Sequence, residues 1–387
     1  MGRISALDND LYKFSMQQAV LHQFPSAKVE YKFKCRTPGV DFRAYESDII
    51  KEVNKMCRTV CFTDNDLNYL SNINHLSDDY IQFLKLFRFD YKYIYIFTDN
   101  SGDLYVDIKG PWLHTILFEE PVLSIISEIY STDMSNNFEL FENRTKEKIK
   151  LIENTDIKIA DFGGRRRHSK KAHDYIIKEF TNNCPNNFIG TSNVMFAKKY
   201  NIKPIGTMAH EWLQAHQAFV KIEDSQFKAL ENWAKEYRGD LGIALSDVVG
   251  LKYFLKDFDL YFSKLFDGTR HDSGDPIHYG NSIIKHYKDK GIDSKTKTIV
   301  FSDGLTVPKA LSIYNYFTDR INVSFGIGTN LTNDFDFEPL QIVLKMIKCN
   351  KAHVAKLSDT PGKSMCTSKK YLDTLKFIFD EKIKGNG

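Results

Sequence analysis

The chain has 387 residues with a formal net charge of +3, and 42% of its residues are hydrophobic and 27% charged. This balance is typical of globular proteins, and it excludes collagen-like and wholly disordered chains. The near-neutral charge argues against binding to nucleic acid or acidic membranes through overall charge. No uncharged apolar run reaches the roughly 18 residues that cross a bilayer, and the N-terminus lacks an apolar signal segment. We therefore expect a cytoplasmic protein of two domains, with reduced thiols and with neither membrane nor nucleic-acid partners.

The N-terminal third mixes helical and strand patterns. Apolar spacing predicts a helix over 10–22, and the alternation in VEYKFKCR predicts a strand over 29–36. YKYIYIF at 91–97 and DLYVDIKG at 103–110 predict a β-hairpin. The long apolar stretch at 111–130 predicts a buried helical passage.

From about residue 156, short apolar strands alternate with helical patterns. Each strand ends in a small or polar cluster: IKIADFGGRRRHS, FIGTSN, IKPIGTMAH, LGIALSD, LFDGTRHDSGDP, TIVFSDG and INVSFGIGTN. This alternation predicts an α/β fold with a parallel sheet and right-handed crossovers. About seven such units favour a closed α/β barrel over an open sheet, and in a barrel the active site forms at the carboxyl ends of the strands.

Residues that could carry chemistry recur at these strand ends. They are Phe162, Arg165, Thr191, Ser192, Thr207, His210, Asp247, Arg270, Asp272, Asp303, Gly326 and Gly328. Their recurrence at equivalent places, rather than any one of them, predicts a site there.

Three of the segments allow more than one interpretation. FGIGTN could turn backbone N–H groups toward a phosphate or form a tight turn; it is no dinucleotide fingerprint, because Leu331 replaces the third glycine. The basic run at 165–171 could bind phosphates, form a solvated loop or contact nucleic acid. GTRHDSGDP could hold an anion, sugar hydroxyls or Mg²⁺, or form an Asx-rich turn.

GTMAHEWLQAH invites comparison with a zinc protease, but the motif fails. H-E-x-x-H requires histidine at position 214, where this chain has Gln214. His210 at a helix start could be an ordinary hydrogen-bonded histidine. Its place at a strand end also suits a nucleophile.

The chain resembles the nicotinate phosphoribosyltransferase family nearly from end to end. The segments that carry the resemblance appear in order: DLYKFSM, YKFKCR, DFGGRRRHS, GTSNVMFAKKY, KPIGTMAHEW, DGTRHDSGDP, FSDGL, FGIGTNLTND and KLSDTPGKS. The resemblance implies synthesis of nicotinate mononucleotide from nicotinate and phosphoribosyl pyrophosphate (PRPP), with release of pyrophosphate. It further implies a requirement for Mg²⁺ and coupling to ATP hydrolysis.

The resemblance also implies an architecture. We expect an irregular α/β barrel of the type II phosphoribosyltransferase kind over 126–344. A second α+β domain is expected over 1–125, joined by 345–387. Related enzymes form their sites across a homodimer interface, so a homodimer is expected.

By resemblance, several residues take roles in the reaction. His210 is expected to be phosphorylated by ATP, and Asp272 to bind ribose hydroxyls. Phe162 and, from the partner subunit, Tyr12 are expected to stack on the pyridine ring. The remaining ring-site and substrate residues are Arg165, which would bind phosphate, Thr191, Ser192 and Arg270. The ribose and phosphate residues are Arg36, Ser302, Asp303, Gly326, Gly328, Thr329, Lys356 and Lys363. The metal ligands are unknown.

Position 192 bears on substrate choice. Related nicotinamide-specific enzymes carry an aspartate where this chain has Ser192, and an aspartate would repel a carboxylate substrate. The alternatives are a nicotinamide or quinolinate phosphoribosyltransferase, a phosphosugar barrel enzyme without ATP coupling, and a nucleic-acid-binding protein that uses the basic run.

Overall fold

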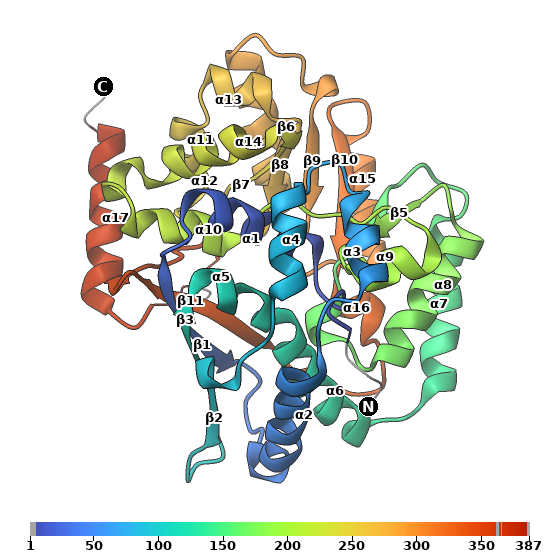
Figure 1. Ribbon diagram of the computed structural model, residues 1–387. Helices are drawn as coiled ribbons and strands as arrows, with labels where there is room; N and C mark the ends of the chain where they lie inside the picture. Colours follow the sequence, from blue (N-terminus) through green and yellow to red (C-terminus); the bar gives the residue numbers. More distant parts are fainter. Residues whose placement is uncertain (1–4, 361–363, 365, 385–387) are drawn as a thin grey trace. The chain divides into compact units, whose positions relative to one another are not determined.

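The computed structural model describes residues 5–360, 364 and 366–384. The chain forms two compact units, each made of two chain segments (Figure 1). Unit 1 comprises Met1–Gly206 and Ile327–Lys345, and unit 2 comprises Thr207–Gly326 and Met346–Gly387. The domain boundaries expected from the sequence, at 125/126 and 344/345, stay a prediction.

Unit 1 begins with the predicted helix and a small antiparallel sheet. The strands lie in the order β1-β3-β2, with Tyr31 opposite Ile108 and Ile96 opposite Val106. Alternate residues of β1 are buried, as the period of two in the sequence predicts. The bounds are α1 (Leu11–Gln23), β1 (Lys28–Cys35), β2 (Ile94–Thr98) and β3 (Leu104–Pro111).

Short helices connect these strands. Thr63 and Asp66 form a reciprocal capping box at the start of α3, which satisfies two free backbone N–H groups. The connecting elements are η1 (Phe42–Ala44), α2 (Glu46–Thr59), α3 (Asp64–Ser71), α4 (Asp78–Leu86) and η2 (Tyr91–Tyr93).

The apolar passage at 111–130 is helical and buried, as predicted, but it is made of three pieces. These are α5 (Trp112–Thr115), η3 (Ile116–Phe118) and α6 (Glu119–Met134). The proline of α6 occupies its third position, where no helical N–H is lost. Glu119 and Glu120, the first two residues of α6, are buried, which is unusual for carboxylates.

The rest of unit 1 carries two of the predicted strand–helix pairs. β4 (Ile159–Asp161) and β5 (Phe188–Thr191) are parallel. The helical elements here are α7 (Phe138–Ile152), η4 (Gly164–Arg166), α8 (Lys170–Asn183), α9 (Val194–Tyr200) and α16 (Thr329–Thr332). The strand expected within IKPIGTMAH is wrong: only Pro204 pairs, in an isolated bridge with Thr191. Proline has no N–H to donate to a sheet ladder.

Unit 2 contains parallel strands in the order β10-β9-β8-β7. The strands are β7 (Ile243–Leu245), β8 (Gly268–His271), β9 (Thr298–Phe301) and β10 (Asn322–Ile327). The helices that follow two of them begin at side-chain caps. Asp275 accepts from His278 N–H before α14 (Pro276–Asp289), and Thr306 accepts from Lys309 N–H before α15 (Val307–Phe317). This confirms the predicted α/β fold with a parallel sheet.

The remaining elements of unit 2 complete the chain. They are α10 (His210–Ala215), η5 (His216–Ala218), η6 (Ile222–Asp224), α11 (Ser225–Tyr237), β6 (Arg238–Leu241), α12 (Leu251–Asp257), α13 (Leu260–Leu265), η7 (Ser294–Thr296), β12 (Ala352–His353) and α17 (Lys369–Lys384). β11 (Ile342–Cys349) runs from unit 1 into unit 2. Among the described residues, no helix is both long and apolar enough to cross a membrane. All six cysteines are free thiols.

Candidate active site

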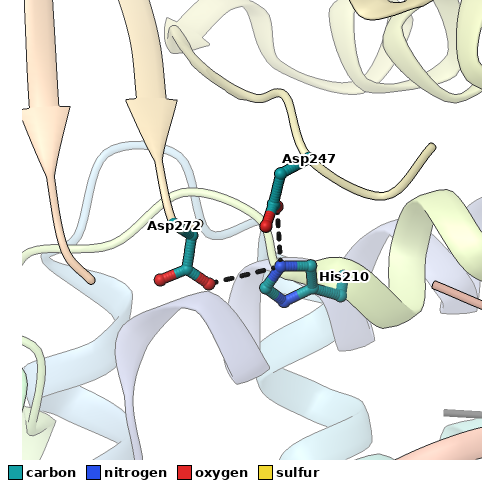
Figure 2. Close-up of side chains that lie close together, drawn as sticks. All are labelled: His210, Asp247 and Asp272. Carbon is teal, nitrogen blue, oxygen red and sulfur yellow. Dashed lines mark hydrogen bonds and ion pairs between the residues drawn. The ribbon is translucent and has the colours of Figure 1, made fainter. Parts of the chain in front are cut away.

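A histidine and two aspartates meet in unit 2 (Figure 2). His210 Nε2 lies 2.9 Å from Asp247 Oδ1 and 3.2 Å from Asp272 Oδ2. His210 is the first residue of α10, while Asp247 and Asp272 follow β7 and β8. Because β7 and β8 are parallel neighbours, their carboxyl ends bring the two carboxylates to the same edge of the sheet.

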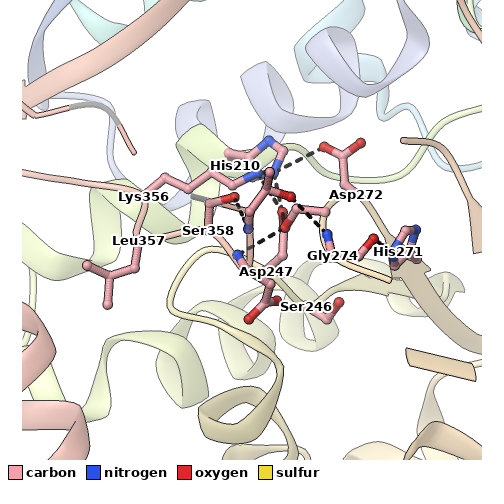
Figure 3. A network of polar contacts seen from close by, with 12 residues as sticks. His210, Ser246, Asp247, His271, Asp272, Gly274, Lys356, Leu357 and Ser358 are labelled. Atoms are coloured by element: carbon pink, nitrogen blue, oxygen red, sulfur yellow. Dashed lines mark hydrogen bonds and ion pairs between the residues drawn. The ribbon is translucent and has the colours of Figure 1, made fainter. Parts of the chain in front are cut away.

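Lys356 completes what we call the histidine cluster, formed by His210, Asp247, Asp272 and Lys356 (Figure 3). Its Nζ lies 2.6 Å from Asp247 Oδ2 and 2.8 Å from His210 Nε2. Ser273 Oγ donates to Asp247 Oδ2 at 2.6 Å. His210 is 6% and Asp247 1% exposed, so these charges interact with little screening by water.

The electrostatics keep this histidine neutral. Burial, with help from the ammonium of Lys356, lowers the pKa of His210 to about 4. Burial alone would raise the pKa of Asp247, but Lys356 and His210 hold that pKa well below its usual value. The result at neutral pH is an uncharged imidazole beside an ionised carboxylate, the arrangement that makes a ring nitrogen nucleophilic.

An arginine–carboxylate contact lies next to the histidine cluster. Arg270 Nη2 lies 3.5 Å from Asp272 Oδ2, and its Nη1 donates to the backbone carbonyl of Met208. Ser302 Oγ donates to Asp272 Oδ1 at 3.0 Å. Burial opposes ionisation of Asp272, but Arg270 and then His210 lower its pKa.

The segment that carries Lys356 is tied to the same loops. Asp359 accepts from the backbone N–H of Leu251 at the start of α12, and its own N–H donates to Ser273 Oγ at 3.2 Å. Thr360 Oγ1 accepts from Gly274 N–H at 3.0 Å. These contacts fix the segment against the loop after β8, which positions the lysine.

Unit 1 holds a second buried polar group, which we call the glutamate cluster: Asp10, Tyr12, Glu119, Glu120 and Arg165. Tyr12 Oη donates to Glu120 Oε1 at 3.0 Å, and Arg165 Nε lies 3.4 Å from the same oxygen. Tyr12 is 8% and Glu120 2% exposed. Tyr12, expected to act across a subunit interface, is thus bonded within its own chain, and its role stays a prediction.

The two glutamates that begin α6 have opposite surroundings. Lys13 Nζ lies 2.6 Å from Glu119 Oε2, and Lys345 and Arg165 flank the other oxygen at 3.8 and 3.6 Å. Burial would raise the pKa of Glu119, but these cations, Lys13 first, hold it at about 2. Burial, reinforced by Asp10, raises the pKa of Glu120 well above its usual value.

Ser192 is held by the start of the chain. Its Oγ donates to Asp10 Oδ1 at 2.7 Å, and its carbonyl accepts from Leu11 N–H at 2.8 Å. Ser192 and Asp10 are each 2% exposed.

Behind Ser192, Asp161 links two strand ends. Its Oδ2 accepts from Thr191 Oγ1 at 2.6 Å and lies 2.7 Å from His173 Nε2, while Oδ1 accepts from Gly163 N–H. Asp161 therefore fixes both the loop after β4 and the loop after β5.

The basic run at 165–171 points largely inward. Arg167 makes two bonds to Asp8 at 2.7 and 2.9 Å, with both side chains almost fully buried. Arg166 donates to Gln341 Oε1 and to the Ile342 carbonyl. Arg166 and Arg167 are therefore held by contacts within unit 1, while Lys171 at the end of the run is exposed.

Other residues expected at the site lie at strand ends. The Phe162 N–H donates to the Ile327 carbonyl at 2.9 Å, and a Cβ on Gly328 would lie 3.2 Å from the Phe162 carbonyl. Thr329 begins α16, and Arg36 follows β1. Gly326 lies within β10 and Asp303 follows β9. Lys363 lies outside the described residues.

Three residues of these clusters were not among the expected site residues: Asp10, Glu119 and Glu120. Asp247 was expected at a strand end but was given no role. Glu120 interrupts the apolar stretch at 111–130. A carboxyl group within such a stretch indicates a buried polar site. Asp10 was expected only as the start of a helix.

Sequence profiles of known families match most of the chain. The profile of the nicotinate phosphoribosyltransferase (NAPRTase) family matches residues 157–383, and the profile of its N-terminal domain matches residues 7–127.

Known proteins are similar over nearly the whole length. A nicotinate phosphoribosyltransferase of Burkholderia mallei is 52% identical over 384 residues, which cover 97% of this chain and 96% of that protein. A protein of the same name from Xylella fastidiosa is 51% identical over 383 residues, covering 97% of each.

Solved structures agree in fold. The crystal structure of nicotinate phosphoribosyltransferase from Vibrio cholerae matches with a TM-score of 0.93 at 36% identity, covering 97% of this chain and 93% of that one. The enzyme from Porphyromonas gingivalis matches with a TM-score of 0.94 at 32% identity, covering 98% and 100%. These matches confirm the expected fold class, an α/β barrel of the type II phosphoribosyltransferase kind with a second, N-terminal domain. The chain belongs to the nicotinate phosphoribosyltransferase family.

Proposed function

We propose that the protein transfers the phosphoribosyl group of PRPP to the ring nitrogen of nicotinate, giving nicotinate mononucleotide and pyrophosphate, and that it couples this transfer to ATP hydrolysis through His210. The observation that carries the ATP coupling is the 2.9 Å contact between His210 and Asp247. Such a product belongs to the biosynthesis of pyridine nucleotides.

His210 is proposed as the phosphoryl acceptor. A neutral imidazole attacks the γ-phosphorus of ATP; the bond to the ADP oxygen breaks as the N–P bond forms, and water later releases phosphate. With its pKa lowered to about 4 by burial and Lys356, His210 has a free nitrogen lone pair at neutral pH. Asp247 stabilises the positive charge that develops on the ring.

Lys356 and Arg270 are proposed as the cations that meet the phosphates in unit 2. Lys356 Nζ lies 2.8 Å from Nε2 of the His210 ring, where an ammonium offsets the charge of a phosphoryl group that arrives at the ring. Arg270 offers a planar guanidinium that suits a phosphate or the nicotinate carboxylate. Ser302 and Asp272, which bond to each other, would bind ribose hydroxyls. Asp303, Gly326, Gly328, Thr329, Arg36 and Lys363 are proposed to contribute to the ribose and phosphate contacts.

The donor set of the histidine cluster fits Mg²⁺. Asp247 and Asp272 present carboxylate oxygens, the ligands that Mg²⁺ prefers, and with His210 they offer ligand atoms within 4.8 Å of one another. These two aspartates would hold the ion, which when bound would supply positive charge against the departing pyrophosphate.

Unit 1 is proposed to bind the pyridine ring. Phe162 and, from the partner subunit of the proposed dimer, Tyr12 would stack on the ring, and Arg165 would attract the anionic substrate. Thr191 and Ser192 would face the ring carboxylate. The ring nitrogen is already nucleophilic, so orientation of the ring, rather than a general base, drives the attack on C1′. We further propose that the protein is cytoplasmic and that it forms a homodimer. Light scattering tests the dimer.

The first experiment measures mononucleotide from labelled nicotinate, PRPP and Mg²⁺ with and without ATP, with nicotinamide and quinolinate in parallel. We expect product from nicotinate alone, increased by ATP. Product only from nicotinamide or only from quinolinate would overturn the assignment of substrate.

A His210→Ala variant tests the coupling. It should lose ATP hydrolysis and ATP stimulation while retaining slow PRPP-dependent synthesis. His22→Ala, a change at an exposed position in the last turn of α1, is the matched control. It should keep both ATP hydrolysis and ATP stimulation. Undiminished ATP stimulation in His210→Ala would refute the role of His210.

A further inference from the structure

Two carboxyl groups lie against each other in the glutamate cluster. The side chains of Glu120 and Asp10 lie close enough to share a hydrogen bond. Both approach the backbone of Gly164: a Cβ on that residue would lie 3.1 Å from Glu120 Oε2 and 3.6 Å from Asp10 Oδ1. A hydrogen bond between two carboxyl groups requires that one of them carry a proton. At 2% exposure each, the pair cannot rely on water to separate two negative charges.

The other bonds of the pair say where the proton lies. Glu120 Oε1 accepts from Tyr12 Oη at 3.0 Å, so this oxygen is already engaged as an acceptor. Asp10 Oδ1 accepts from Ser192 Oγ at 2.7 Å. Oε2 of Glu120, which does not take part in the Tyr12 bond and approaches Gly164 together with Asp10 Oδ1, is therefore the atom to which we assign the shared proton.

Protonation of Glu120 determines the charge available on Arg165. Arg165 Nε lies only 3.4 Å from Glu120 Oε1, so the negative charge of an ionised Glu120 would offset the positive charge of the guanidinium. The other nearby carboxylate, Glu119, is already matched by Lys13 at 2.6 Å and faces Lys345 at 3.8 Å. With Glu120 neutral, Arg165 keeps positive charge for an anionic ligand.

We propose that Glu120 is a specificity-determining residue that works in its protonated form: the proton it shares with Asp10 preserves the positive charge of Arg165 and so allows nicotinate, an anion, to bind beside Ser192. This inference rests on the proposed function, in which unit 1 binds the ring. Glu120 itself acts through Arg165 and Tyr12 and is a positioning residue.

The surroundings of Glu120 support this protonation state. Burial and then the Asp10 carboxylate raise the pKa of Glu120 well above its usual value, and Arg165 opposes this without reversing it. The titratable and charged groups that face the pair come from α1 with its cap, α6, η4 and β11: Asp10, Tyr12, Lys13, Glu119, Arg165 and Lys345.

The test is KM for nicotinate between pH 6 and 9.5 in the wild type and in Glu120→Gln, Glu120→Ala and Glu139→Gln, the last being an exposed glutamate of α7. In the wild type, KM should rise with pH by up to about tenfold per unit above the pKa of Glu120. Glutamine keeps an acceptor for Tyr12 and a donor toward Asp10 but does not titrate. Glu120→Gln should therefore keep KM within about threefold of the wild-type value at low pH, without the alkaline rise.

Glu120→Ala should raise KM by about tenfold or more at every pH, because Tyr12 loses its acceptor. Glu139→Gln should follow the wild-type profile. The inference fails if Glu120→Gln shows the same alkaline rise as the wild type, or if the folded variant is as impaired as Glu120→Ala.

A second measurement does not depend on activity. A carboxyl group whose pKa is raised by folding stabilises the protein fully below its unfolded pKa, and this contribution is lost as pH rises toward the folded pKa. Thermal unfolding of the wild type should show this loss above about pH 4.5, and Glu120→Gln should lack it. A wild-type enzyme that makes no product from nicotinate would overturn the proposed function, whereas an identical pH–stability profile in Glu120→Gln would overturn the shared proton.

Discussion

Lys356 and His210 stand 146 residues apart in the chain, yet Lys356 Nζ lies 2.8 Å from His210 Nε2. The same ring nitrogen lies 2.9 Å from Asp247 Oδ1. Nε2 can accept from an ammonium only without its proton, and it can donate to a carboxylate only with it. Lys356 and Asp247 therefore favour opposite tautomers of His210, and movement of Lys356 toward a phosphate would shift the ring proton onto Nε2 and leave Nδ1 free.

Replacement of this lysine tests its role. Lys356→Met should lower the rate of ATP hydrolysis by about tenfold or more, because a buried cation beside the imidazole is worth at least ~1.4 kcal/mol to an arriving phosphoryl group. The measurement is steady-state ADP release. Lys370→Met, at an exposed position of α17, is the control and should match the wild type. If Lys356→Met hydrolysed ATP at the same rate as the control, Lys356 would not act at the proposed phosphate site.

Two consecutive glycines should respond differently to alanine. A Cβ on Gly163 would lie 2.3 Å from Thr332 Cγ2, and Thr332 Oγ1 also donates to the Gly163 carbonyl. A Cβ on Gly164 would meet Glu120 Oε2 at 3.1 Å, which a small shift relieves. We expect Gly163→Ala to destabilise the protein by about 2–3 kcal/mol, and Gly164→Ala by about half as much. Denaturant unfolding with both variants checks the order, and the reverse order would contradict this packing.

His216 makes stability depend on pH on the acid side. It lies within hydrogen-bond distance of the Trp212 carbonyl, through Nδ1, and of Asn232 Nδ2, through Nε2. Burial lowers the pKa of His216 to about 4. Because the unfolded chain binds this proton near pH 6.5, stability falls as pH drops from about 6.5 to 4, by at most ~3 kcal/mol from this group.

A His216→Gln variant should lack that part of the acid loss. The comparison is the free energy of unfolding of the variant and of the wild type at pH 7 and at pH 4.5. Equal differences in both proteins would show that His216 does not remain neutral in the fold.

The pair of Asp8 and Arg167 should be sensitive to removal of one partner. Both side chains are almost fully buried and make two bonds, at 2.7 and 2.9 Å. Asp8→Ala leaves the buried guanidinium with only Glu128, which lies 3.7 Å from its Nε, and should destabilise the protein by about 3 kcal/mol. The double variant Asp8→Leu, Arg167→Met should recover much of that loss by thermal unfolding. A double variant less stable than Asp8→Ala would contradict this.

The regular elements were largely predictable because their causes are local. The alternation of buried and exposed residues in β1 and the side-chain cap of α15 at Thr306 each depend only on residues that are close together in the sequence. The strand expected around Pro204 is wrong although the cause is local: the proline has no N–H to donate to a neighbouring strand, and the apolar pattern did not show this. The break of the passage at 111–130 into three helical pieces was likewise not visible in its apolar spacing.

The candidate site was predictable only in part. His210 and Asp272 stand at strand ends and were found by position and resemblance. The partnership of Tyr12 with Glu120 spans 108 residues, and that of Ser192 with Asp10 spans 182. No spacing rule connects such distant residues, so only the fold shows which carboxyl groups share a site.

Unit 1 is discontinuous, and this sets an order of events on the ribosome. The loop after β4 is closed by Thr332, which bonds to Gly163 and lies in the late segment Ile327–Lys345. At about 5–20 residues per second, the intervening part of unit 2 takes on the order of 10 s to synthesise. Throughout that interval the nascent loop that carries Phe162 and Arg165 lacks its closing partner, so a stalled or truncated chain cannot present the finished form of the proposed ring site. Chaperones that recognise incompletely folded chains should therefore bind nascent chains halted before residue 327 and release those extended past 345.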